Sequence, residues 1–187
     1  MALRTVDVTL DNLSEAPEEV LEAVFWELDL DECDDPRFHK EEWFSLTLLE
    51  WGSCGKMLVD EEAVGFAEYA PPSLFPRLLR FPTGKISDDA VYLSYLYLVP
   101  GRRGKGLGSD LLHSVARDLL ERGYRALEAV GDREPAGGWV LPANFLEGSG
   151  FHVIREDPRY PLLRLDLTAR AEPVTATAAA VARPPAD

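Results

Sequence analysis

The sequence predicts one domain of the α/β class. Residues 91–130 show the pattern of a strand, a glycine-rich turn, an amphipathic helix and a second strand in immediate succession. Residues 55–70 show two short strands with a connection of hairpin length between them. A chain of 187 residues suits one domain with a sizeable core and is too short for two comfortable ones. We therefore expect a domain over residues 1–168 and a flexible tail over 169–187, which is rich in Ala, Pro, Thr and Val.

The N-terminal part is expected to begin with a strand and two helices. Residues 3–10 alternate loosely between apolar and polar types, as strands do. Ser14 is placed to cap a helix whose apolar stripe consists of Val20, Leu21, Val24, Phe25 and Leu28. An acidic loop follows at residues 29–35, and Asp35 with Pro36 predicts the start of a second helix.

The middle of the chain contains a long connection at residues 71–89, which is rich in proline and apolar side chains. Such a loop is not stable in water, so it is expected to pack over the sheet or to line a pocket. Near the C-terminus, a short helix is expected at residues 143–149, followed by strands at 153–154 and 163–167.

The central unit begins with residues 91–99, whose β-branched and aromatic side chains suit a buried strand. Pro100 ends this strand, because proline has no N–H to donate to a neighbouring strand. After the turn at 101–108, apolar residues recur at helical spacing: Leu107, Leu111, Leu112, Val115, Ala116, Leu119 and Leu120. Gly123 is placed for a left-handed cap, and residues 126–130 return as a strand.

The glycine-rich turn predicts an anion-binding site. The first turn of a helix leaves backbone N–H groups unpaired, and the helix dipole adds partial positive charge there. Glycines allow the backbone to approach a phosphate closely, and basic side chains add formal charge. The turn supplies both types of residue: Gly104, Gly106, Gly108, Arg102, Arg103 and Lys105.

Two well-known phosphate loops do not match this turn. A P-loop requires G-x-x-x-x-G-K-[ST], but Lys105 precedes the second glycine and no Ser or Thr follows it directly. A dinucleotide fingerprint requires G-x-G-x-x-G, whereas residues 104–108 have G-x-G-x-G spacing.

Residues 103–108 do match the pattern [QR]-x-x-G-x-[GA] between a strand and a helix. With this order of elements, the chain resembles the GCN5-related N-acetyltransferase (GNAT) family, in which this loop binds acetyl-CoA. A short helix ending in Gly-Phe at 150–151 resembles the second signature of the family. The resemblance covers residues 91–167 well and the N-terminal half by element order only. The alternative is a tight turn that happens to carry basic residues.

The resemblance implies a central, mixed, mostly antiparallel sheet of about seven strands with helices on both faces. Two strands would splay apart beside the glycine loop to admit the pantetheine arm. Acetyl-CoA would be the co-substrate, and its acetyl group would pass directly to a primary amine of a small molecule or a protein. The oxyanion donor would be the backbone N–H of Leu98 or Val99. The residues expected to contact the cofactor are Leu98, Val99, Arg103, Gly104, Lys105, Gly106, Leu107, Gly108, Ser109 and Asn144.

The general acid of the family is not found at its usual place. Many members have a Tyr four residues before the Gly of the Gly-Phe pair, but Leu146 stands there and the neighbouring Phe145 cannot donate a proton. Tyr95, Tyr97 and Tyr160 are the alternatives, with Tyr97 as the candidate catalytic residue, although each also fits a packed aromatic role. The missing Tyr keeps a second function open, a non-catalytic acyl-CoA-binding module.

A base is also required, because an amine with a pKa of ~10.4 is almost fully protonated at neutral pH. We expect Glu68, on a strand next to the central one, to act through a water molecule. Asp132, at the end of the strand after the helix, is the second candidate. Either residue also fits an exposed carboxylate at a strand end. Trp139 occupies a position where the family often has Asn, so cofactor contacts from that segment are in question.

The composition restricts the partners. A net charge of −14 disfavours nucleic acid and anionic membranes and suits a cationic acceptor, although it also fits simple solubility. No apolar run reaches the ~18 residues that a membrane span needs, and no signal segment opens the chain, so we expect a cytoplasmic protein. Neither Cys33 and Cys54 nor His39, His113 and His152 show the spacing of a metal site. The identity of the acceptor and the oligomeric state, including a homodimer, stay open.

Overall fold

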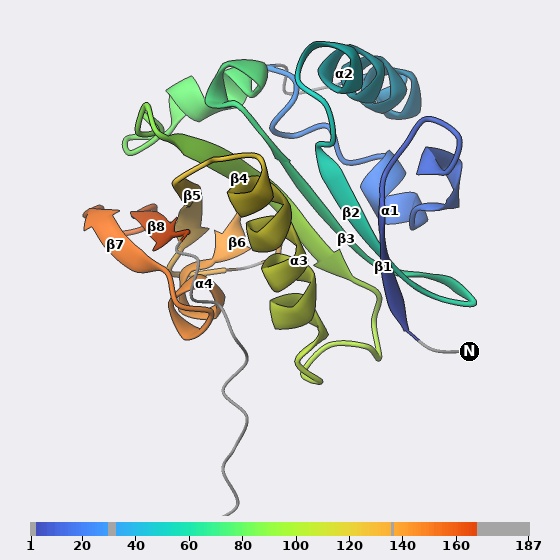
Figure 1. The fold of residues 1–187 in the computed structure, drawn as a ribbon. Coiled ribbons are helices and arrows are strands. Elements are labelled where there is room, and N and C mark those ends of the chain that lie inside the picture. The colour runs from blue at the N-terminus through green and yellow to red at the C-terminus, as the bar shows by residue number, and fades with distance from the viewer. Residues whose placement is uncertain (1–2, 30–32, 136, 168–187) are drawn as a thin grey trace, which may run out of the picture.

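The structure is a computed structural model that describes residues 3–29, 33–135 and 137–167. Its centre is an eight-stranded mixed sheet in the order β1-β2-β3-β4-β5-β8-β7, with β6 paired to β5 (Figure 1). The strands are β1 (Arg4–Asp7), β2 (Gly55–Asp60), β3 (Glu62–Ala70), β4 (Ala90–Leu98), β5 (Ala126–Asp132), β6 (Leu141–Pro142), β7 (His152–Arg155) and β8 (Leu162–Asp166). The expected mixed sheet with a mostly antiparallel arrangement is confirmed.

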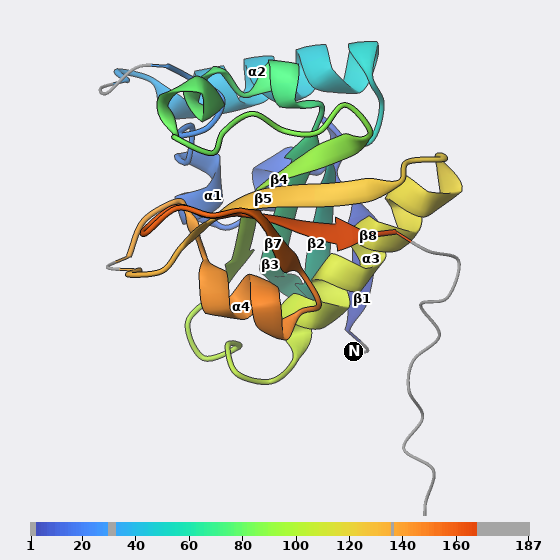
Figure 2. The ribbon, with the colours of Figure 1, turned by 90° about the vertical axis from the view of Figure 1, so that its left-hand side faces the viewer.

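Helices cover both faces of the sheet, as Figure 2 shows. One face carries α1 (Glu18–Leu21), α2 (Pro36–Glu50) and the 3-10 turns η1 (Leu13–Glu15), η2 (Pro72–Leu74) and η3 (Pro76–Arg80). The other face carries α3 (Leu107–Glu121) and α4 (Ala143–Gly148). Each face has its own apolar core, because alternate side chains of a strand point to opposite sides.

The feature that positions the site is the separation of β4 from β5. These parallel strands pair only from Ala90 to Tyr92 with Ala126 to Glu128. Beyond Tyr92, β4 stays paired with β3 on its other side as far as Leu98. The two central strands therefore open a gap at the end that leads into the glycine turn.

A β-bulge lies in β4 at the point where this gap begins. Glu68 pairs with Tyr95 and Tyr69 pairs with Leu93, so Ser94 is an extra residue without a partner position. A bulge re-aims the side chains of its strand. Here Ser94 donates hydrogen bonds to the backbone carbonyl of Glu68 and to its carboxylate.

Most expected elements are present. The second helix begins at Pro36 with Asp35 as its cap, whose carboxylate accepts the N–H of Phe38 at 3.1 Å. The hairpin of β2 and β3, the helix α3 and the left-handed Gly123 (φ 85°) also follow the sequence analysis. The connection 71–89 packs over the sheet, where Phe75 is buried in the core beneath α2.

The prediction of a long helix after Ser14 is wrong. Only Glu18–Leu21 is helical, and the chain then continues through turns. The side chains of Ala23, Trp26 and Glu27 are all buried at three- and four-residue spacing, so this pattern does not reveal that the helix has ended. The expected tail lies outside the described residues, as does part of the acidic loop. Within the described residues, no helix is both long and apolar enough to span a membrane.

Candidate functional site

A cleft of about 880 Å³ opens where β4 leaves β5. Its walls come from segments that are far apart in the chain: α1, the end of β4, the glycine turn, the segment before β6, and α4. The lining residues are Glu19, Tyr95, Leu96, Tyr97, Leu98, Arg103, Gly104, Gly106, Gly108, Ser109, Pro135, Gly137, Gly138, Trp139, Val140, Leu141, Pro142 and Phe145. A cleft of this size has room for an extended cofactor arm.

The glycine turn forms one end of the cleft. Gly104 (φ 71°) and Gly106 (φ 82°) adopt left-handed conformations that other residues rarely adopt, and Gly106 caps α3. A Cβ on Gly108 would lie 3.2 Å from the ring of Phe145, so glycine lets α3 and α4 approach closely. Of the expected cofactor residues in this turn, Lys105 and Leu107 do not line the cleft.

The two candidate oxyanion donors differ in their bonding. The N–H of Val99 donates to the carbonyl of Val64 at 3.0 Å and is therefore already used. Bonding alternates along an antiparallel pair, so the N–H and C=O of Leu98 face the opposite edge of β4, toward the gap. The Leu98 carbonyl accepts the Nε–H of Arg103 at 3.0 Å there. Leu98 is the better candidate of the two.

Two of the three candidate acids line the cleft. The rings of Tyr95 and Tyr97 stack at 6.2 Å on one face of β4. Partial burial and the neighbouring Glu19 carboxylate raise the pKa of Tyr97, so its phenol is protonated at neutral pH and able to donate. Tyr160 instead packs against Phe81, away from the cleft lining. Leu146 is buried in the core around α3.

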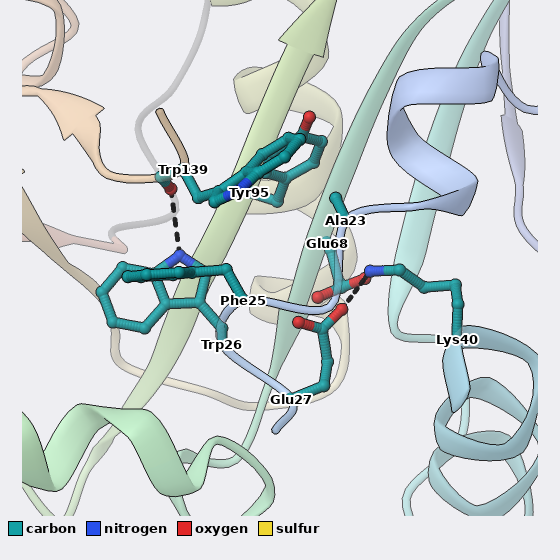
Figure 3. Close-up of a pocket in the computed structure, with 8 residues that line it drawn as sticks. All are labelled: Ala23, Phe25, Trp26, Glu27, Lys40, Glu68, Tyr95 and Trp139. Atoms are coloured by element: carbon teal, nitrogen blue, oxygen red, sulfur yellow. Dashed lines mark hydrogen bonds and ion pairs between the residues drawn. The ribbon is translucent and has the colours of Figure 1, made fainter. Parts of the chain in front are cut away.

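Glu68 lies inside a buried charged cluster, which we call the cage and define as Glu27, Lys40 and Glu68 (Figure 3). The ammonium of Lys40 donates to Glu68 Oε2 at 2.9 Å and to Glu27 Oε1. Ser94 Oγ donates to Glu68 Oε1 at 2.8 Å. Each of the three side chains in the cage is at most 2% exposed.

The electrostatics of the cage follow from one cation serving two anions. Burial raises the pKa of Glu68, and the Glu27 carboxylate raises it further, which together outweigh Lys40 and Ser94 and bring it to about 8. Burial alone would lower the pKa of Lys40, but the two carboxylates outweigh this effect and raise it. Lys40 is therefore an ammonium, and Glu68 takes up a proton near neutrality.

Two aromatic rings separate the cage from the cleft. Among the described residues, Tyr95 and Trp139 are the ones that line both the cleft and the small gap beside the cage. Figure 3 shows the hydroxyl of Tyr95 pointing away from the three charged side chains. The carbonyl of Trp139 accepts the indole N–H of Trp26 at 3.0 Å. The gap beside the cage is too narrow to hold a water molecule.

The other expected site residues lie apart from the cleft. Asp132 ends β5, where Oδ1 accepts the N–H of Glu134 at 2.9 Å and lies 3.5 Å from Arg159 Nε. Asn144 is exposed on α4 and does not line the cleft. Across the described residues, no group of three or more His, Cys, Asp or Glu side chains is arranged to hold a metal ion.

Sequence reasoning missed Glu19, Glu27, Lys40 and Ser94. For Lys40 a signal existed, because it shares the buried face of α2 with Trp43, Phe44 and Thr47 at helical spacing. A lysine at such a position requires a buried anion as its partner. The partners themselves come from distant segments and could not be identified.

Comparisons with known proteins agree with this geometry. The family model of the acetyltransferase (GNAT) family matches residues 20–138. No curated protein matches the chain significantly. Among solved structures, yncA from Salmonella typhimurium, determined with its cofactor acetyl-CoA, has a TM-score of 0.64 and 18% identity, covering 94% of this chain and 99% of that one.

Two further structures show the same fold. An N-acetyltransferase from Staphylococcus aureus Mu50 has a TM-score of 0.60 and 16% identity, covering 90% of this chain and 100% of that one. The paia N-acetyltransferase from Thermoplasma acidophilum, in complex with coenzyme A, has a TM-score of 0.55 and 16% identity, covering 89% and 99%. The co-substrate of the matched family is acetyl-CoA. The chain therefore belongs to the GNAT acetyltransferase family.

Proposed function

We propose that this protein is an N-acetyltransferase that moves the acetyl group of acetyl-CoA directly to a primary amine. The observation that carries the proposal is the cleft, which connects the glycine turn with Tyr97 and ends at the rings that cover Glu68. Such a cleft suits a ligand with phosphates at one end and a reactive thioester at the other.

In the proposed reaction, the nitrogen lone pair of the amine forms a bond with the thioester carbon. The C–S bond then breaks, and CoA leaves as a thiolate. The backbone N–H of Leu98 stabilises the oxyanion, and Tyr97 supplies a proton to the thiolate. Glu68 is the proposed base, because it lies directly behind Tyr95 and Trp139, which line the cleft. Asp132 is less suited, because its carboxylate is already used by the N–H of Glu134.

The proposed acceptor is a cationic amine, free or attached to a protein. The net charge of −14 attracts cations over long distances. Within the cleft, the lining carries the carboxylate of Glu19 beside Tyr97.

The test is turnover of acetyl-CoA with a panel of diamines, monoamines, amino acids and lysine-containing peptides. Release of the CoA thiol gives the rate, and mass spectrometry with NMR of the product distinguishes an amide from an ester. We expect amide formation with at least one class of amine. Binding of acetyl-CoA without turnover of any amine would instead favour the acyl-CoA-binding module, for which Leu146 and the covered Glu68 provide a rationale.

A further inference from the structure

The cage contains two carboxylates and only one ammonium group. Its side chains come from three separate places: Glu27 from the segment between α1 and α2, Lys40 from α2, and Glu68 from β3. One ammonium cannot neutralise two carboxylates, and water does not reach the cluster to screen them. The two carboxylates therefore compete for one cation, and the cluster gains by binding one proton.

The other groups that face Glu68 do not supply this proton. Ser94 and Tyr95 of β4 lie beside it, and Cys54, just before β2, is close enough to feel its charge. Burial and the carboxylate of Glu68 together raise the pKa of Cys54, and burial with Tyr97 and Glu68 raises that of Tyr95. Both are therefore neutral near pH 7 to 8, and Lys40 stays charged. Among these groups, the one that exchanges a proton near neutral pH is Glu68.

We propose that Glu27 and Lys40 are positioning residues that hold Glu68 ready to take the proton which the acceptor amine loses. This inference rests on the proposed amine acetylation. Lys40 holds the Glu68 carboxylate beside Ser94 in the bulge of β4. Glu27 accepts a hydrogen bond from the same ammonium, so Lys40 neutralises Glu68 only in part, and Glu68 stays basic enough to accept a proton near neutral pH. The proton travels from the amine nitrogen to a Glu68 oxygen and is later returned to solvent.

The wall between the cage and the cleft consists of two aromatic residues. Tyr95 and Trp139 stand between Glu68 and the cleft. Trp139 follows two left-handed glycines, Gly137 (φ 88°) and Gly138 (φ 128°). Its ring lies 5.5 Å from that of Tyr95, measured between centroids. A proton that passes from the cleft to Glu68 therefore has to pass this pair of rings.

The arrangement predicts shifts in opposite directions for two substitutions. In the wild type, kcat/KM should rise with pH through a midpoint near 8 as Glu68 loses its proton. In Glu27→Gln, Lys40 serves Glu68 alone, so this midpoint should move down by about one pH unit or more. In Lys40→Met, two carboxylates lack a cation, so the midpoint should move up by a similar amount. A role limited to stability would not move the two midpoints in opposite directions.

The matched control is Glu15→Gln, which makes the same chemical change at an exposed carboxylate outside the cleft and the cage. Its midpoint should equal that of the wild type. Circular dichroism and thermal unfolding check that each variant folds. If Lys40→Met does not fold, the downward shift in Glu27→Gln decides alone, and an unmoved or raised midpoint there overturns the proposal.

A second readout separates this inference from the proposed function. The side-chain carboxyl carbon of Glu68, assigned by comparison with Glu68→Gln, can be titrated by NMR in the wild type and in Glu27→Gln. A lower titration midpoint in Glu27→Gln together with the kinetic shift supports the inference. If the carboxyl shifts but kcat/KM does not, Glu68 is not the proton acceptor although amine acetylation stands. If the wild type acetylates no amine, the proposed function fails, and the catalytic role of the cage fails with it.

Discussion

Tyr97 combines two properties that a general acid needs. It lines the cleft, and its phenol carries a proton at neutral pH, as that of any tyrosine with an ordinary or raised pKa does. We predict that Tyr97→Phe lowers kcat by about 100-fold, because the leaving thiolate loses its proton donor, while the Kd for acetyl-CoA changes little. Steady-state kinetics and calorimetry measure the two quantities separately.

Tyr160→Phe is the control for this substitution, because Tyr160 packs against Phe81 and does not line the cleft. It removes the same hydroxyl and should leave kcat unchanged. An equal loss of kcat in both variants, or no loss in Tyr97→Phe, would remove Tyr97 from the mechanism.

At the scale of single residues, the sequence indicates individual side chains better than their partners. Glu68 could be selected because its strand lies next to the central strand in the implied fold. Its partner Lys40 lies 28 residues away in the chain, and nothing in the local pattern of either segment joins them. The bulge that aims Ser94 at Glu68 depends on the register of β3 and β4, which the sequence does not reveal. The catalytic roles of Glu68, Tyr97 and Asp132 remain predictions.

At the scale of elements, the packing of α4 on β5 depends on a glycine. A Cβ added to Gly131 would lie 2.8 Å from Leu163 Cδ1 and 3.0 Å from the Cα and Cβ of Ala143. We predict that Gly131→Ala lowers the free energy of unfolding by about 1–3 kcal/mol, because the first residue of α4 cannot move away without disturbing the core. Chemical denaturation measures this change.

Gly148→Ala is the matched control, since it makes the same substitution at the end of α4 where an added Cβ meets nothing within 4 Å. Alanine is the better helix former, so the stability should be unchanged or should rise by up to ~1 kcal/mol. Equal destabilisation by both substitutions would show that close packing at Gly131 is not the cause.

The helix expected after Ser14 shows where local patterns fail. The spacing of its apolar residues is helical. However, the backbone carbonyls of Phe25 and Leu28 accept hydrogen bonds from Arg77 Nε, and the carbonyl of Asp29 accepts one from the guanidinium of Arg80. The side chain of Trp26 then packs in the core, and that of Glu27 lies in the cage. Tertiary contacts with η3 therefore override helix propensity, and the sequence contains no local sign of them. By contrast, the cap at Asp35 and the amphipathic α3 could be predicted, because their signals are local.

At the scale of the whole molecule, the site is a consequence of how the sheet is assembled. Strands β4 and β5 pair over three residues and then separate. Beyond that point β4 stays paired with β3 and β5 with β8, and the cleft lies between β4 and β5. The order of elements along residues 91–130 could be inferred from the residues themselves. The opening of the sheet could be expected only from the family resemblance, because strand pairing over long distances leaves no trace in a single sequence.

The central claim is that the glycine turn holds acetyl-CoA in this cleft, and thermal unfolding with and without the cofactor tests it most directly. The test compares the wild type with Gly106→Glu and Gly123→Glu. Both glycines have left-handed conformations (φ 82° and 85°), and an added Cβ at either one meets nothing within 4 Å. The two variants therefore carry the same strain and the same added charge, but Gly123 lies outside the cleft lining.

Acetyl-CoA at about one hundred times its Kd stabilises a protein by ~2.7 kcal/mol, which raises the melting temperature measurably. We predict this rise in the wild type and in Gly123→Glu and its loss in Gly106→Glu, where the added carboxylate repels the phosphates. Equal rises in all three proteins, or no rise in the wild type at millimolar acetyl-CoA, would contradict the assignment of the cofactor to this turn.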